Sequence, residues 1–190
     1  MNQLNTTDEW LMGQVASGNR EHLETLVRRY ASGLLTYIHR MVGDRHRAEE
    51  LFQDVFLAVW EKRRTYRFPR TFRSWLFSIA TNRCRQAFRQ APSVAVLPLP
   101  DDGGKTPASG TQTPVQSAVA TETAQLVAQA VASLPPAQRT VVVLRNWNGL
   151  AYGEIAQIVG RSEGTVRSHM HHALAGIRKY LEPRLRADDL

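Results

Sequence analysis

The stretch from residue 62 to residue 89 contains nine cations, six aromatic residues and no acidic residue. Cations spaced along a surface attract a phosphate backbone, and rings stack on unpaired bases at roughly 1–3 kcal/mol per base. The stretch therefore predicts a protein that handles opened DNA or RNA. The cations are Lys62, Arg63, Arg64, Arg67, Arg70, Arg73, Arg83, Arg85 and Arg89, and the first rings are Tyr66, Phe68 and Phe72. The rings that follow Arg73 fit the core of a helix equally well.

A second nucleic-acid element spans Tyr152 to His172, where the pattern is that of a helix-turn-helix. Gly160 suits the turn because glycine adopts a positive φ most easily, and Ser162 suits the N-cap of the second helix. The inward stripe of that helix is expected to be Val166, Met170, Leu174 and Ile177. Its outer surface, which a recognition helix presents to the major groove, carries Arg161, Glu163, Thr165, Arg167, Ser168, His169, His171 and His172. Short helix pairs with a glycine turn also occur in bundles that bind no nucleic acid.

Three of these side chains raise the question of a metal site. His169 and His172 are three residues apart and could both reach one ion, whereas His171 points elsewhere. No carboxylate or thiol lies close by in the sequence to complete the ligand set. Contact with bases or phosphates is therefore preferred, plain solvent exposure is the remaining reading, and no metal or cofactor is predicted.

The apolar residues follow the helical period over most of the chain, and no segment alternates convincingly at period two. We therefore expect an all-α fold. The predicted helices cover about residues 23–42, 47–63, 71–89, 126–134, 136–144, 151–159 and 163–181. Residues 91–118 differ, because five of the nine prolines lie there among glycine, serine and threonine, which is typical of a flexible linker. Two small helical domains, residues 1–90 and 119–190, are expected on either side of it.

The composition indicates what kind of partner the protein binds and in which cell compartment it is expected. The formal net charge is +7, and residues 1–90 hold 15 Lys or Arg against 9 Asp or Glu, which favours an anionic partner. The single cysteine, Cys84, excludes an internal disulfide and a cysteine-based zinc site, and its place in a helical repeat predicts a core position. The N-terminus is polar rather than a secretion signal, and no apolar run approaches the roughly 20 residues that span a bilayer. We expect a cytoplasmic protein without membrane insertion.

Two blocks of the chain resemble one known family. Residues 20–90 contain LETLVRRY, RAEELFQDVFLAVWE and FRSWLFSIATNRCRQAFR, which look like region 2 of an extracytoplasmic-function (ECF, group 4) sigma factor of the sigma-70 family. The run LPPAQRTVVVLRNWNGLAYGEIAQIVGRSEGTVRSHMHHALAGIRKYL looks like region 4 of the same family. The blocks follow the family's order, with its proline-rich linker between them.

The resemblance implies roles in region 2. In the family, one helix of this region binds the clamp helices of the largest RNA polymerase subunit, and a loop captures a flipped base of the minus-10 promoter element. Polymerase binding falls here on Glu50, Gln53 and Asp54. Minus-10 binding falls on Arg64, Tyr66, Arg67, Phe68, Arg70, Phe72, Asn82 and Arg83.

The resemblance also implies roles in region 4, which reads the minus-35 element in the family. The matching positions are Arg161, Thr165, Arg167, Ser168, His169, His171 and His172. The implied partners are core RNA polymerase (through the clamp helices and the flap of the second-largest subunit), promoter DNA and an anti-sigma factor. Such a protein directs polymerase to promoters and assists DNA opening, and it has no catalytic residues of its own.

This chain departs from the family pattern at two places. Ala151 stands where Ser or Thr often caps the first helix of the helix-turn-helix, so Glu154 lacks its capping-box partner. His169 and His172 stand where arginines are common, and neutral histidine cannot make the bidentate guanine contact of arginine. The upstream sequence preference is therefore expected to be unusual.

Two other classes of function bind or act on nucleic acids. A helix-turn-helix regulator that binds DNA without acting as an initiation factor is the alternative, but a response regulator would carry a βα receiver in the first 90 residues. A nuclease or nucleotidyltransferase would need clustered carboxylates for metal ions, and the basic stretch has none. No catalytic residue is therefore predicted.

Overall fold

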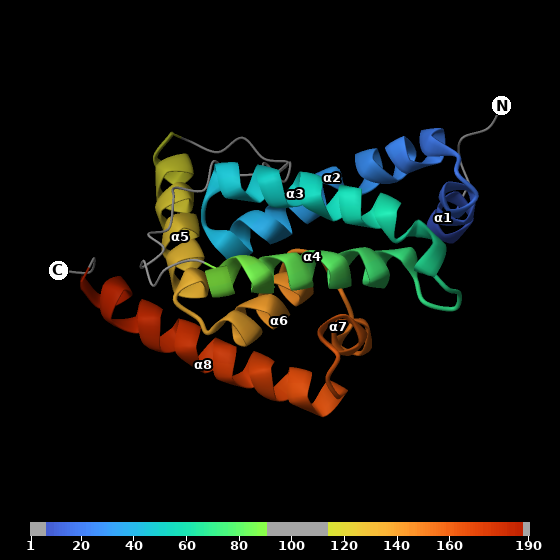
Figure 1. Ribbon diagram of the computed structural model, residues 1–190. Coiled ribbons are helices and arrows are strands. Elements are labelled where there is room, and N and C mark those ends of the chain that lie inside the picture. Colours follow the sequence, from blue (N-terminus) through green and yellow to red (C-terminus); the bar gives the residue numbers. More distant parts are fainter. Residues whose placement is uncertain (1–6, 91–113, 188–190) are drawn as a thin grey trace.

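The structure, a computed structural model, describes residues 7–90 and 114–187. Within these ranges the chain is helical and contains no strand, which confirms the predicted all-α class (Figure 1). No helix of the described part is long and apolar enough to cross a membrane. The elements are α1 (Asp8–Ala16), α2 (Arg20–Val42), α3 (Arg45–Glu61), the 3-10 turn η1 (Arg63–Thr65), α4 (Phe72–Gln90), α5 (Pro114–Ala132), α6 (Pro136–Asn146), α7 (Tyr152–Val159) and α8 (Glu163–Ala187).

The predicted linker falls largely outside the described residues, which resume at the start of α5. That helix begins at Pro114, inside the range predicted as linker. A proline suits the first turn of a helix, because its fixed φ is helical and its missing N–H has no partner there. Pro114, which the sequence pattern assigned to the linker, is therefore the first residue of a helix.

Helices α2, α3 and α4 pack side by side in the N-terminal half, with α1 across one end (Figure 1). The α2–α3 turn is set locally: Gly43 adopts a φ of 76°, and the Asp44 side chain accepts from the Arg47 amide at 2.6 Å. In the core, the ring of Tyr37 meets that of Phe77 edge-on at 5.5 Å between centroids. Apolar burial on three helices thus fixes the bundle.

Cys84 lies fully buried in this bundle, which confirms the predicted core position. Burial raises the pKa of its thiol to about 12. The thiol is therefore a small apolar core group rather than a nucleophile.

Helices α5 to α8 form the C-terminal half around the buried run Val141–Leu144 of α6. The predicted helix-turn-helix is confirmed in its local geometry: Gly160 has a φ of 66°, and Ser162 Oγ accepts from the Thr165 amide at 3.2 Å. The Glu154 carboxylate accepts from the Ala151 amide at 2.8 Å, so half of the capping box forms although Ala151 offers no acceptor.

The prediction that Leu174 belongs to the inward stripe of α8 is wrong. Leu174 is 53% exposed, and Ala173 is buried in its place. The reason is the close approach of α8 to Leu134, whose Cδ2 lies only 3.0 Å from where a Cβ on Gly176 would be. Small residues at positions 173 and 176 permit that approach, and the larger leucine is turned outward.

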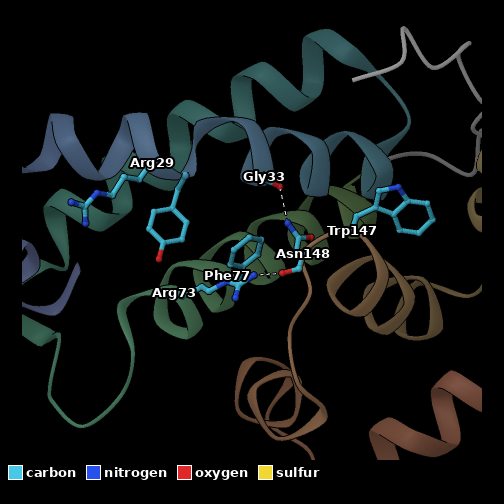
Figure 2. A pocket seen from close by; sticks show the side chains of 7 residues that line it. Arg29, Gly33, Arg73, Phe77, Trp147 and Asn148 are labelled. Carbon is cyan, nitrogen blue, oxygen red and sulfur yellow. Dashed lines mark hydrogen bonds between the residues drawn. The ribbon is translucent and has the colours of Figure 1, made fainter. Parts of the chain in front are cut away.

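The two halves touch through polar side chains that reach backbone carbonyls. Arg139, buried and with its pKa lowered by burial, donates from Nη1 to the Met41 carbonyl at 2.7 Å. Asn148 donates from Nδ2 to the Gly33 carbonyl at 3.0 Å, and Arg73 donates to the carbonyl of Asn148 (Figure 2). These contacts place α7 against α4 and α6 against α2.

Candidate nucleic-acid and polymerase interfaces

The segment from residue 62 to residue 71, called the basic loop below, connects α3 to α4. Its two ends are closed by short hydrogen bonds: Thr65 donates its amide to the Lys62 carbonyl at 2.8 Å, and Tyr66 donates its hydroxyl to the Arg70 carbonyl at 2.6 Å. Phe68, followed by a cis peptide bond, lies between these ends with 81% of its surface exposed. An apolar ring held in water in this way is suited to stacking on a base.

The predicted stacking role of Phe72 is wrong. Its ring is 0% exposed and packs against Tyr30 at 5.4 Å and Tyr66 at 6.4 Å between centroids. Phe72 begins α4, so the helix turns it into the core, whereas Phe68 lies before the helix and is free of that constraint. A base has no access to the buried ring.

Tyr66 is half-buried, between the exposed Phe68 and the buried Phe72 in exposure. Its ring meets that of Trp75 at 5.3 Å between centroids, and its hydroxyl donates to the backbone carbonyl of Arg70. The pKa of Tyr66 is raised to about 12, first by burial and then by the carboxylates of Glu9 and Asp8. Tyr66 therefore supports the loop as a neutral ring and leaves Phe68 as the exposed one.

The polar residues predicted to bind the minus-10 element divide into exposed and half-buried side chains. Arg64 and Arg67 are exposed on the basic loop, and Asn82 is exposed on α4, whereas Arg70 and Arg83 are half-buried. Arg67 turns back to donate from Nη1 to the Arg64 carbonyl at 2.5 Å. The structure thus gathers the predicted minus-10 residues on the loop and along α4, with the loop cations nearest to Phe68.

The N-terminus of α8 presents the predicted minus-35 residues. Arg161, Ser168, His171 and His172 are exposed, and Thr165 and His169 are half-buried. Arg167 is already engaged: its Nη2 lies 2.5 Å from Glu163 Oε1, and its guanidinium stacks on Tyr152 at 4.5 Å from the ring centroid.

The histidines do not assemble with acidic or thiol groups in the described ranges. There, no three His, Cys, Asp or Glu side chains come together in a way that could hold a metal ion. The rings of His171 and His172 lie edge-on at 5.8 Å between centroids and face solvent.

A third candidate surface lies on the outer face of α3. Glu50 and Gln53 are exposed, Asp54 is half-buried, and Glu50 accepts from Arg47 Nη1 at 2.8 Å. Leu57, one turn beyond Gln53, is 60% exposed and adds an apolar contact to this polar face. Sequence reasoning did not assign Leu57, although its place outside the apolar stripe of the helix was a signal.

A cavity of about 370 Å³ lies where the two halves meet (Figure 2). Figure 2 shows Asn148 between α2 and α4, with its amide toward Gly33 and its carbonyl toward Arg73. The guanidinium of Arg40 lies over the ring of Trp147 at 4.2 Å from its centroid. The cavity is lined by Arg29, Tyr30, Gly33, Arg73, Phe77, Trp147 and Asn148.

Two family matches define the class of protein. Sigma-70 region 2 matches residues 26–93, and Sigma-70, region 4 matches residues 124–175. The basic loop falls within the first match, and the N-terminus of α8 falls within the second. The chain is therefore built from regions 2 and 4 of the sigma-70 class.

Curated relatives narrow the class to one family. The chain is 34% identical over 158 residues to the ECF RNA polymerase sigma factor SigE of Mycolicibacterium smegmatis, covering 83% of this chain and 61% of that protein. It is 30% identical over 161 residues to the ECF RNA polymerase sigma factor SigL of Mycobacterium tuberculosis, covering 84% and 89%. It is 29% identical over 185 residues to the RNA polymerase sigma-H factor of Pseudomonas aeruginosa, covering 94% and 96%. The chain belongs to the ECF RNA polymerase sigma factors.

Solved structures agree with the fold. CnrH, in complex with the cytosolic domain of CnrY, superposes with a TM-score of 0.71 at 25% identity, covering 94% of this chain and 99% of that one. The sigma factor RpoE from Bartonella quintana, in complex with the anti-sigma factor NepR, has a TM-score of 0.61 at 20% identity, covering 86% and 98%. The second likeness concerns the fold alone.

Proposed function

We propose that this chain binds core RNA polymerase, directs it to specific promoters and assists the opening of promoter DNA. The single observation that carries the proposal is the exposed ring of Phe68 at the tip of a cationic loop, in a chain that also holds a helix-turn-helix. A base leaving the duplex loses stacking, and an exposed ring next to cations offsets that loss. The chemistry of RNA synthesis belongs to the polymerase, and no catalytic residue is assigned to this chain.

The two DNA surfaces are proposed to act on different elements. The minus-10 surface consists of Arg64, Tyr66, Arg67, Phe68, Arg70, Asn82 and Arg83, with Phe68 stacking and Tyr66 supporting it. The minus-35 surface consists of Arg161, Thr165, Arg167, Ser168, His169, His171 and His172. Arg167 bonds Glu163 through Nε and Nη2, and the other N–H donors of its guanidinium are proposed to bond a guanine edge while Glu163 holds the side chain in place.

The remaining contacts are proposed to be with proteins. Glu50, Gln53 and Asp54, with Leu57 beside them, form the surface for the clamp helices of polymerase, and the C-terminal half contacts the flap. We propose residues 1–90 and 119–190 as the two functional units with residues 91–118 as their connection, and the cytoplasm, where polymerase works, as the site of action. The solved complex of CnrH with the cytosolic domain of CnrY supports a protein partner for this chain too, and we propose that this partner is an anti-sigma factor.

The packed arrangement of the two halves is proposed to open on a promoter. Two elements about 25 base pairs apart are separated by about 85 Å at roughly 3.4 Å per base pair. A compact chain of this length is roughly 40 Å across. The contacts of Arg139 with Met41 and of Asn148 with Gly33 therefore have to break before both surfaces reach straight DNA.

The test is reconstitution with core polymerase. Transcripts induced by overexpression identify candidate promoters, and run-off transcription from these promoters is then measured with and without the purified chain. Promoter-specific transcripts that depend on the chain support the proposal. A chain that binds upstream DNA but neither copurifies with core polymerase nor starts transcripts is instead a helix-turn-helix regulator.

A further inference from the structure

Helix α1 lies outside the matched region 2, which begins at residue 26. It nevertheless packs against η1, which begins the basic loop, and against α4, which follows the loop (Figure 1). Leu11, Met12 and Val15 bury its apolar face in the bundle. The helix is thus a fixed part of the fold, placed directly beside the loop.

Glu9 of α1 caps the helix that follows the loop. The backbone amide of Phe72, at the start of α4, donates to Glu9 Oε1 at 3.1 Å across 63 positions of sequence. The first amides of a helix have no partner within it, and a carboxylate there is favoured by the helix dipole. A second cap is local, because Thr71 Oγ1 accepts from the Ser74 amide at 3.2 Å.

Asp8 links α1 to helix α2. Its carboxylate accepts from Arg29 Nη1 at 2.6 Å and from the hydroxyl of Tyr30 at 2.5 Å. The ring of Tyr30 in turn packs on Phe72. The two carboxylates of α1 are therefore both linked to Phe72, Glu9 through its backbone amide and Asp8 through the ring of Tyr30.

The loop that carries the exposed ring of Phe68 is held at both of its ends. One end is η1, against which α1 packs, and the other is Phe72, whose amide Glu9 holds. Between them, the hydroxyl of Tyr66 closes the loop on the Arg70 carbonyl. Fixing both ends fixes the direction in which Phe68 leaves the surface.

The two carboxylates also stand next to a surface of cations. A negative charge there weakens attraction for phosphate, so Asp8 and Glu9 do not serve DNA affinity as such. We infer that Glu9, held in place by Asp8, is a positioning residue that orients the basic loop for base capture. This inference rests on the proposed function and assigns a role to a helix that the family match leaves out.

The test compares three variants at one position. Glu9→Ala removes the acceptor, Glu9→Gln keeps an acceptor of the same reach without charge, and Glu9→Asp keeps the charge but shortens the reach. Each is assayed with core polymerase for permanganate reactivity of a duplex promoter and for transcription from a template with a pre-opened bubble. Hydrogen exchange at the Phe72 amide reports the hydrogen bond directly.

We expect Glu9→Ala and Glu9→Asp to lower duplex opening about tenfold, the change that corresponds to losing a hydrogen bond to a charged group. The bubble template should be transcribed near the wild-type level, and Glu9→Gln should restore opening and slow exchange at Phe72. Glu21→Ala, which removes an exposed carboxylate at the start of α2, is the charge-matched control and should leave opening unchanged.

The inference is overturned if Glu9→Ala opens duplex promoters normally, if it loses both templates equally, or if Glu9→Gln is as impaired as Glu9→Ala. The last result would assign the effect to charge rather than to position. Failure of the proposed function looks different, because the wild-type chain would then be inactive on duplex and bubble templates alike.

Discussion

The two proposed DNA surfaces are held in place by different kinds of contact. The recognition surface of α8 is set by neighbours in sequence: Ser162 caps Thr165, and Glu163 pairs with Arg167. The basic loop has local bonds too, such as that of Tyr66 with Arg70, but the helix start that ends it is also held by a distant residue, Glu9. A surface that reads duplex sequence can be rigid and local, whereas a loop that receives a flipped base depends on the bundle beneath it.

The largest effect is expected when the two surfaces are prevented from separating. Cysteines replacing Gly33 and Asn148 can be bridged by a short bifunctional methanethiosulfonate, because an ideal Cβ on Gly33 lies 3.5 Å from Asn148 Nδ2. The bridged chain should lose promoter-dependent transcription by a factor of about ten or more, at least about 1.4 kcal/mol, and regain it on reduction. Run-off transcription measures this.

Treated single-cysteine variants are the controls for the bridge, and both should transcribe normally. Native Cys84 does not interfere, since it is fully buried. A bridged chain as active as the unbridged one would show that the packed arrangement serves on the promoter without opening.

Substitutions of two phenylalanines distinguish a role in base capture from a role in folding. Phe68→Ala should reduce promoter opening by the roughly 1–3 kcal/mol of one stacked base and leave the free energy of unfolding unchanged. Phe72→Ala should instead lower the free energy of unfolding by about 3–5 kcal/mol, as for a buried ring. Permanganate reactivity and urea denaturation distinguish the two, and equal unfolding curves for both variants would contradict the assignment.

A smaller and more specific effect is expected on the recognition surface. Arg167→Ala should relax the upstream sequence preference by about 1–3 kcal/mol at one base pair, without changing transcription from a bubble template. Binding of the chain to a panel of single-base variants of the upstream element measures the change. Uniform weakening across the panel would assign Arg167 to phosphate contact instead.

The smallest effect concerns the missing cap. Ala151→Ser completes the capping box with Glu154, whose carboxylate already accepts from the residue 151 amide. The substitution should raise the free energy of unfolding by about 1 kcal/mol, seen in thermal denaturation. Promoter selection should stay the same, since residue 151 lies before α7 rather than on the recognition helix.

The same contrast explains what could be predicted from the sequence. Gly160, Ser162 and the turn between them follow rules that act over three or four residues, and they were predicted correctly. Phe68 and Phe72 could not be told apart, because Pro69 interrupts the helical period that separates buried from exposed positions. Glu9 was beyond reach, since its partner lies 63 positions away.

Packing between helices explains the other difference. Positions 173 and 174 both continue the inward stripe of α8 by spacing, and in the structure Ala173 is buried and Leu174 exposed, on a helix that approaches Leu134 closely at Gly176. Patterns therefore predicted the elements and the general surfaces, and tertiary contacts selected the individual side chains.

The burial of Cys84 has a consequence for how this factor can be controlled. It is the chain's only sulfhydryl, and with a pKa near 12 it is almost never ionised at neutral pH. Peroxides and electrophiles attack the ionised form of a thiol, so buried Cys84 is a poor target for them. A thiol-based sensor of oxidative stress for its regulon therefore has to be another molecule, which would act on this one by binding.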